Sequence, residues 1–81
     1  MFKARTEDGR NNISGLRVKE LHKALQISQR ELSDRLQVVG LDIDKNAVQR
    51  IESGERFVTD IEIIALSKCF NVTVNNLLGI K

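Results

Sequence analysis

Proline is absent from this 81-residue chain, and cysteine occurs once, at Cys69. Without proline, no predicted helix contains a residue that would break it. A single cysteine cannot form a disulfide within the chain, which suits the reducing cytoplasm. We expect Cys69 to be a buried, small apolar residue and not a reactive thiolate.

Long apolar runs are also missing. No stretch approaches the roughly 20 apolar residues of a membrane span, and residues 1–12 lack the apolar region of a signal peptide. The sequence therefore predicts a cytoplasmic protein that does not enter a membrane. Thirteen basic and eleven acidic residues give a net charge of only +2. A polyanionic partner would have to be attracted by the distribution of charge and not by its total.

The sequence carries no recognisable catalytic or metal-binding motif. It has no glycine-rich phosphate loop, no nucleophile paired with a motif-placed histidine, and no carboxylate pair in a known setting. One histidine and one cysteine do not supply the three or four ligands that zinc needs. We expect no enzyme activity, no metal and no cofactor.

A helix-starting pattern occurs five times along the chain. In each, a residue able to cap a helix follows an aliphatic residue and precedes a second aliphatic residue by four positions. The capping residues are Ser14, Ser28, Asp44, Thr59 and Thr73. Ser28 with Glu31, and Thr59 with Glu62, also match a reciprocal capping box. These starts predict helices over residues 15–25, 29–37, 45–53, 60–70 and 74–78.

The predicted fold is all-α, a compact domain of five helices over residues 13–81. Residues 1–12 are polar and without period, and they are predicted to form a flexible arm that touches phosphates or has no role. The segment 60–70 is apolar on nearly every side, which favours a central position in the bundle.

Residues 27–56 have the form of a DNA-reading helix-turn-helix. About 100° per residue places Ala47, Val48 and Ile51 on one side of the second motif helix. Lys45, Asn46, Gln49 and Arg50 lie on the opposite side. Asparagine and glutamine can pair with adenine, and arginine or lysine with guanine. The alternative interpretation of these four residues is an ordinary solvated helix face.

The segments LRVKELHKALQISQRELSDRL, AVQRIESGER and VTDIEIIALSKCFNVTVNNLLG resemble the Cro and lambda-repressor-like (XRE-type) DNA-binding domains. The resemblance spans residues 13–80 and implies a five-helix fold. It implies that Ser28 and Gln29 lie beside a DNA phosphate, and that Asp44, Lys45, Asn46 and Arg50 meet bases. We add Gln49 to the base contacts from its face, and Ser53 and Arg56 to the phosphate contacts.

The chain departs from the family pattern at three places. The turn from Gln37 to Ile43 is roughly five residues longer than usual, and we expect it to fold onto the core through Leu41 and Ile43. Gln26 stands where a glycine is usual, and His22 replaces a common arginine. Because Glu52 sits at the edge of the core side of its helix and His22 lies in the first helix, we expect a charged or hydrogen-bonded pair between them.

The predicted function is sequence-specific binding of double-stranded DNA by a transcriptional regulator, a repressor acting through operator occupancy. We expect a homodimer whose contact is made by Leu77, Leu78 and Ile80, although these residues could instead close the core. The alternative is an antitoxin-type protein that binds both DNA and a protein partner. A pure protein-interaction module would leave the face from Lys45 to Arg50 without a purpose.

Overall fold

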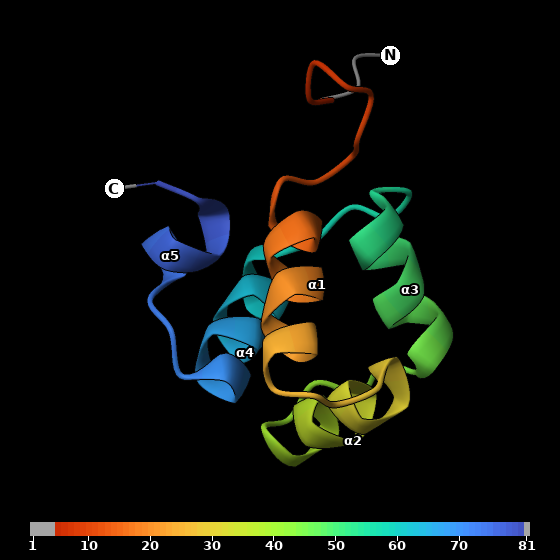
Figure 1. Ribbon diagram of the computed structural model, residues 1–81, viewed down its shortest axis with the longest axis vertical. Helices are drawn as coiled ribbons and strands as arrows, with labels where there is room; N and C mark the ends of the chain where they lie inside the picture. Colours follow the sequence, from red (N-terminus) through yellow and green to blue (C-terminus); the bar gives the residue numbers. More distant parts are fainter. Residues whose placement is uncertain (1–4, 81) are drawn as a thin grey trace.

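All regular structure in residues 5–80, the part of the chain that the computed structural model describes, is helical (Figure 1). The helices are α1 (Ser14–Ala24), α2 (Gln29–Val38), α3 (Lys45–Ser53), α4 (Asp60–Phe70) and α5 (Val74–Leu78). The predicted bounds of α3, α4 and α5 are confirmed, whereas α1 starts and ends one residue earlier than predicted and α2 ends one residue later. The all-α prediction is therefore confirmed.

Four of the five predicted N-caps are confirmed. The side chains of Ser28, Asp44, Thr59 and Thr73 each accept a hydrogen bond from the backbone N–H three residues later. Such bonds satisfy N–H groups that have no partner within the helix. Both halves of a capping box form between Thr59 and Glu62. At Ser28 only the hydroxyl half is present within the described residues.

The predicted cap at Ser14 is wrong. Ser14 is buried inside α1, and its hydroxyl has no hydrogen-bond partner among residues 5–80. The backbone N–H of Gly15 instead donates to Oδ1 of Asn12, at 2.8 Å. The amide oxygen of Asn12, which precedes the helix, thus accepts a hydrogen bond from the start of α1, as the serine hydroxyl was expected to do.

The residue that follows α1 and its C-cap, Gln26, has a backbone conformation that is unfavourable for glutamine. Gln26 has φ of 58°, in the left-handed region that favours glycine. The N–H groups of Gln26 and Ile27 donate to the carbonyls of Lys23 and His22, which closes the helix end. The backbone therefore keeps the conformation that a glycine would adopt freely, although the residue is glutamine.

Helix α1, not α4, occupies the middle of the bundle. Figure 1 shows α1 between α3 on one side and α4 with α5 on the other. The expectation that α4 is central was wrong, because Ile61 is 71% exposed and Ile64 is 50% exposed. The apolar residues of α4 therefore do two things: some pack inward, such as Leu66, and others form an uncovered surface.

The core gathers aliphatic side chains from every helix. Its buried members are Val18, Ile27, Leu32, Leu36, Ile43, Val48, Ile51, Leu66 and Leu77. Leu77 has no exposed surface, so the predicted dimer contact at this residue is wrong and the core interpretation is right. Arg17 reinforces the docking of α5 by donating from Nε and Nη2 to Oδ1 of Asn76.

Cys69 packs against this core but is only half-buried, so the predicted full burial is not reached. Burial raises the pKa of the Cys69 thiol above its ordinary value, and the charge of Arg35 opposes the rise.

Among residues 5–80, no group of three His, Cys, Asp or Glu side chains could hold a metal ion. No helix in this part of the chain combines the length and apolarity needed to cross a membrane.

The long turn between α2 and α3 folds onto the core as predicted. Ile43 is buried, and Leu41 packs against the core from the same segment. The N–H of Leu41 donates to the carbonyl of Leu36 at 2.9 Å, which turns the chain back after α2. The turn is therefore a structural part of the domain.

Replacing Ile43 by serine should lower the free energy of unfolding by roughly 1–3 kcal/mol, because the change removes buried apolar contacts. Urea denaturation followed by circular dichroism would measure the loss. Val38→Ser is the matched control, since Val38 is 87% exposed two residues before the turn's glycine. Equal stability of the two variants would show that the turn contributes nothing to the core.

Candidate nucleic-acid interface

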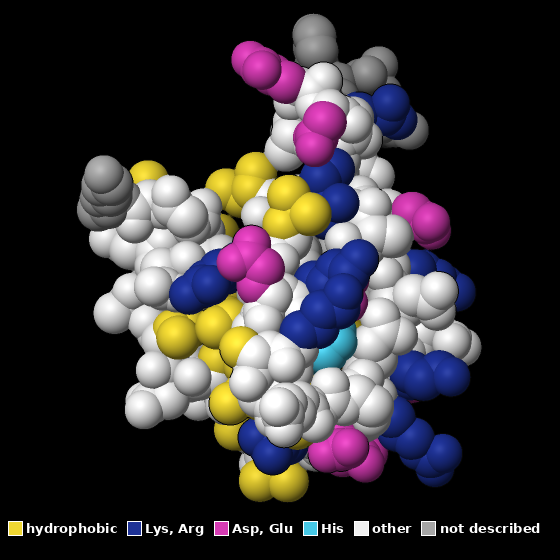
Figure 2. All heavy atoms as spheres, viewed as in Figure 1, with side chains coloured by type: hydrophobic (Ala, Val, Ile, Leu, Met, Phe, Trp, Pro, Cys, Tyr) yellow, Lys and Arg dark blue, Asp and Glu magenta, His cyan; other side chains and the backbone are white. Residues whose placement is uncertain are grey.

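Helix α3 presents one polar face to solvent. Lys45, Asn46, Gln49 and Arg50 are all exposed, while Val48 and Ile51 on the opposite face are buried. Figure 2 shows Lys and Arg side chains gathered along the edge of the molecule that α3 forms. The small net charge is thus distributed so that α3 lies on a basic edge.

A shallow hollow of about 190 Å³ lies on this face. It is lined by Asn46, Gln49, Arg50, Ser53 and Glu55. The structure thus brings together four of the side chains predicted for DNA contact, three of them able to pair with base edges. The fifth, Glu55, was not predicted. Its carboxylate can accept a hydrogen bond from cytosine N4 but would repel a phosphate.

The N-terminal ends of both motif helices point their capping groups to solvent. Asp44 is exposed, and its Oδ1 accepts from the N–H of Ala47 at 2.8 Å. Ser28 is also exposed and accepts from the N–H of Glu31 at 3.0 Å. These two predicted contact residues are therefore also helix caps. The N-terminal end of a helix favours an anion such as phosphate.

Glu52 connects the two motif helices to α1. Its carboxylate is buried, and Nε2 of Gln29 donates to Oε1 at 3.1 Å. Nδ1 of His22 lies 2.7 Å from Oε2, although not in the direction of a linear hydrogen bond. The expected pairing of His22 with Glu52 is thus confirmed as a close approach of the two side chains, and the geometry is not that of a hydrogen bond. Gln29, predicted to meet a phosphate, also ties α2 to α3.

A second hollow, of about 290 Å³, lies between α2 and α3. Arg30 and Lys45 stand on its two sides, with Asp34 and Asp44 also in its lining. Arg30 was not among the predicted contacts. The signal that could have found it is a basic residue in the first turn of α2, next to Gln29.

Arg56 and Ser53 have partners within the protein. Nη2 of Arg56 lies 2.7 Å from Oε2 of the buried Glu62, so the guanidinium ties the end of α3 to the start of α4. Its Nη1 atom is buried without a hydrogen-bond partner among residues 5–80. The hydroxyl of Ser53 donates to the carbonyl of Arg50 at 3.1 Å. A phosphate contact by Arg56 would share this guanidinium with Glu62.

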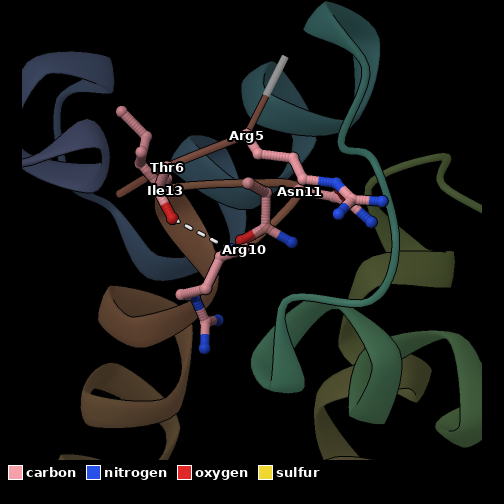
Figure 3. Close-up of a pocket in the computed structure, with 6 residues that line it drawn as sticks. Arg5, Thr6, Arg10, Asn11 and Ile13 are labelled. Carbon is pink, nitrogen blue, oxygen red and sulfur yellow. Dashed lines mark hydrogen bonds between the residues drawn. The ribbon is translucent and has the colours of Figure 1, made fainter. Parts of the chain in front are cut away.

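Residues 10–12 form a clasp on the C-terminal end of α3 (Figure 3). Nη2 of Arg10 donates to the carbonyl of Glu52, and Nδ2 of Asn12 donates to the carbonyls of Ile51 and Arg56. Nδ2 of Asn11 donates to the carbonyl of Glu55. In Figure 3 the Arg10 side chain runs down between α1 and α3. The clasp thus donates to carbonyls in the last turn of α3 and in the segment that follows it.

The prediction of a flexible arm over residues 1–12 is therefore wrong for residues 10–12. Residues 1–4 of that arm lie outside the described residues. A turn precedes the clasp, in which the N–H of Arg10 donates to Oγ1 of Thr6 at 3.0 Å. A hydrogen bond from Thr6 lowers the pKa of the Asp8 carboxyl below its ordinary value. The predicted domain boundary after Asn12 would separate residues 10–12 from the carbonyls at the end of α3 to which they donate.

Helix α1 approaches α3 too closely for any side chain at Gly15. A Cβ built on Gly15 would lie 2.0 Å from the carbonyl oxygen of Ile51. Arg10 covers Gly54 in a similar way, because its side chain would lie 2.9 Å from a Cβ at that glycine. The position of α3 is thus set by α1, by the clasp and by Glu52.

A helix-turn-helix family model matches residues 18–77, well over half of the chain. Neither the curated proteins nor the solved structures contain a match. The matched range includes α2, the turn and α3, and it begins after the clasp.

Proposed function

Because this chain belongs to the XRE-type helix-turn-helix family of DNA-binding transcriptional regulators, we propose that it recognises a specific operator and represses transcription by occupying it. The observation that carries the proposal is the exposed polar face of α3. Asn46, Gln49 and Arg50 line one hollow there, on a helix whose other face is fixed in the core.

In the proposed complex α3 enters the major groove. Its polar face then meets base edges through Asp44, Lys45, Asn46, Gln49 and Arg50. Ser28 and Gln29 at the start of α2, together with Ser53 and Arg56 at the end of α3, contact phosphates. Arg30 joins this set, since it lies across the hollow from Lys45. Phosphate contacts fix the position of the protein, while base contacts select the sequence.

We also propose that the regulator binds as a homodimer. One α3 helix covers only a few base pairs, which gives too little specificity against the competing sites of a genome. Two copies related by a two-fold axis would read half-sites about one helical turn apart. Of the predicted C-terminal contacts, Ile80 is exposed and Leu78 is half-buried, so these two residues can reach a second copy.

Binding to a duplex obtained by selection from a random pool tests the proposal. The logarithm of the affinity should fall linearly with the logarithm of salt concentration, with a slope of about −0.9 for each phosphate neutralised. Fluorescence anisotropy at several salt concentrations measures this slope. An affinity that does not change with salt would contradict the assigned phosphate contacts.

The stoichiometry of the complex separates the regulator from the antitoxin-type alternative. Two protomers on a palindromic site support operator binding by a homodimer. If duplex DNA is bound only after a second protein is added, the chain acts with a protein partner and the antitoxin interpretation replaces the proposal. Light scattering of the protein with and without the selected duplex gives the answer.

A further inference from the structure

An uncovered apolar hollow of about 150 Å³ lies between α4 and the long turn after α2. We name it the α4 groove, and its lining is Val39, Gly40, Leu41, Ile61, Ile64, Ala65 and Lys68. Ile61 and Ile64 are the most exposed of its large apolar side chains, and Val39 is 39% exposed. Exposed apolar patches with a polar rim mark sites of interaction between proteins.

The groove is built by the two features that the helix-turn-helix itself does not explain. One wall is the start of the turn after α2, residues 39–41, in the segment that the sequence indicated to be longer than the family's usual turn. The other wall is the apolar excess of α4, which the core does not use. In Figure 1, α3 lies on the other side of α1 from α4, so a partner in the groove leaves the reading face of α3 free.

The charges along α4 identify the occupant. Asp60, Ile64 and Lys68 are all exposed, and they follow one another at intervals of four residues on one ridge of the helix. The acidic end of this ridge is its N-terminal end and the basic end is its C-terminal end. A second α4 in antiparallel orientation, with its two-fold axis at Ile64, therefore places Asp60 of each copy opposite Lys68 of the other.

We propose that the α4 groove binds a second copy of this chain through an antiparallel pair of α4 helices. Such a two-fold contact uses the same patch on both copies, as isologous interfaces do. The apolar side chains of each copy then cover the groove of the other, and the two helix dipoles oppose one another favourably. The inference rests on the proposed homodimer and gives it an interface different from the C-terminal segment.

Charge reversal tests the pairing. Asp60→Lys alone and Lys68→Asp alone should each raise the dimer dissociation constant at least about tenfold, because two attractive pairs become repulsive. An equimolar mixture of the two variants should restore the wild-type constant, since each of the two contacts then joins a lysine of one copy to an aspartate of the other. Sedimentation velocity of the full chain measures the constants, and circular dichroism verifies the helix content.

An apolar pair of variants provides an independent test. Ile64→Asp should abolish the dimer, whereas Val38→Asp, which lies outside the groove, should leave the dissociation constant unchanged. A monomeric wild type overturns the proposal, as does a mixture that fails to recover. Dissociation by Ile80→Glu with no effect of Ile64→Asp assigns the contact to the C-terminal segment and also overturns it. Binding of each variant to a single half-site tests the DNA-binding proposal separately.

Discussion

Replacing Gly15 by alanine should destabilise the domain, at the upper end of the roughly 1–3 kcal/mol that over-packing costs. At an ordinary helical position the same change stabilises by up to about 1 kcal/mol. The sign reverses here because the new Cβ would lie 2.0 Å from the carbonyl oxygen of Ile51, a backbone atom of α3 that cannot rotate away. Either α1 and α3 move apart, or the helix end reorganises.

Thermal and urea denaturation measure this loss, and affinity for the selected duplex shows whether α3 has moved. Lys19→Ala is the control, because Lys19 is an exposed residue of the same helix. It should change the free energy of unfolding by no more than about 0.5 kcal/mol. A stabilised Gly15→Ala protein would show that the close approach of α1 and α3 does not exist in solution.

Removing a base-reading side chain should have the largest effect on DNA binding. Asn46→Ala or Gln49→Ala should cost roughly 1–3 kcal/mol of discrimination at each half-site, because a bidentate pair with a base is lost. In a dimer the loss occurs at both half-sites and is about twice as large. Binding to unrelated duplexes should change little, since those contacts are to phosphates.

Competition binding with the selected duplex and with a scrambled one separates the discrimination between sequences from the affinity for DNA of any sequence. Gln29→Ala is the comparison, and it should weaken binding to all duplexes similarly, because Gln29 lies at the start of α2, off the reading face, and its bond to Glu52 ties α2 to α3. Both reading variants keep the buried side of α3 intact, so the free energy of unfolding should stay near the wild-type value. Uniform losses for all three variants would mean that the reading face has been misplaced.

The sequence by itself determined most of the helix starts and which side of α3 faces solvent. Caps such as Asp44 and Thr59 act on N–H groups only three residues away, so their signal is local and readable from the chain. The separation of Val48 and Ile51 from Asn46 and Gln49 follows from the helical period in the same way. The exposed polar face of α3 was therefore predictable before any tertiary contact was known.

Only the tertiary structure decided what lies against each face. The bond from Asn12 to the carbonyl of Ile51 joins residues 39 positions apart, and no local pattern marks such a partner. The apolar character of a residue likewise does not indicate whether it will be buried: Leu77 is enclosed by its own chain, whereas Ile61 remains on the surface. Hydrophobicity sets the free energy gained on burial, but the packing of the helices decides which apolar side chains obtain it.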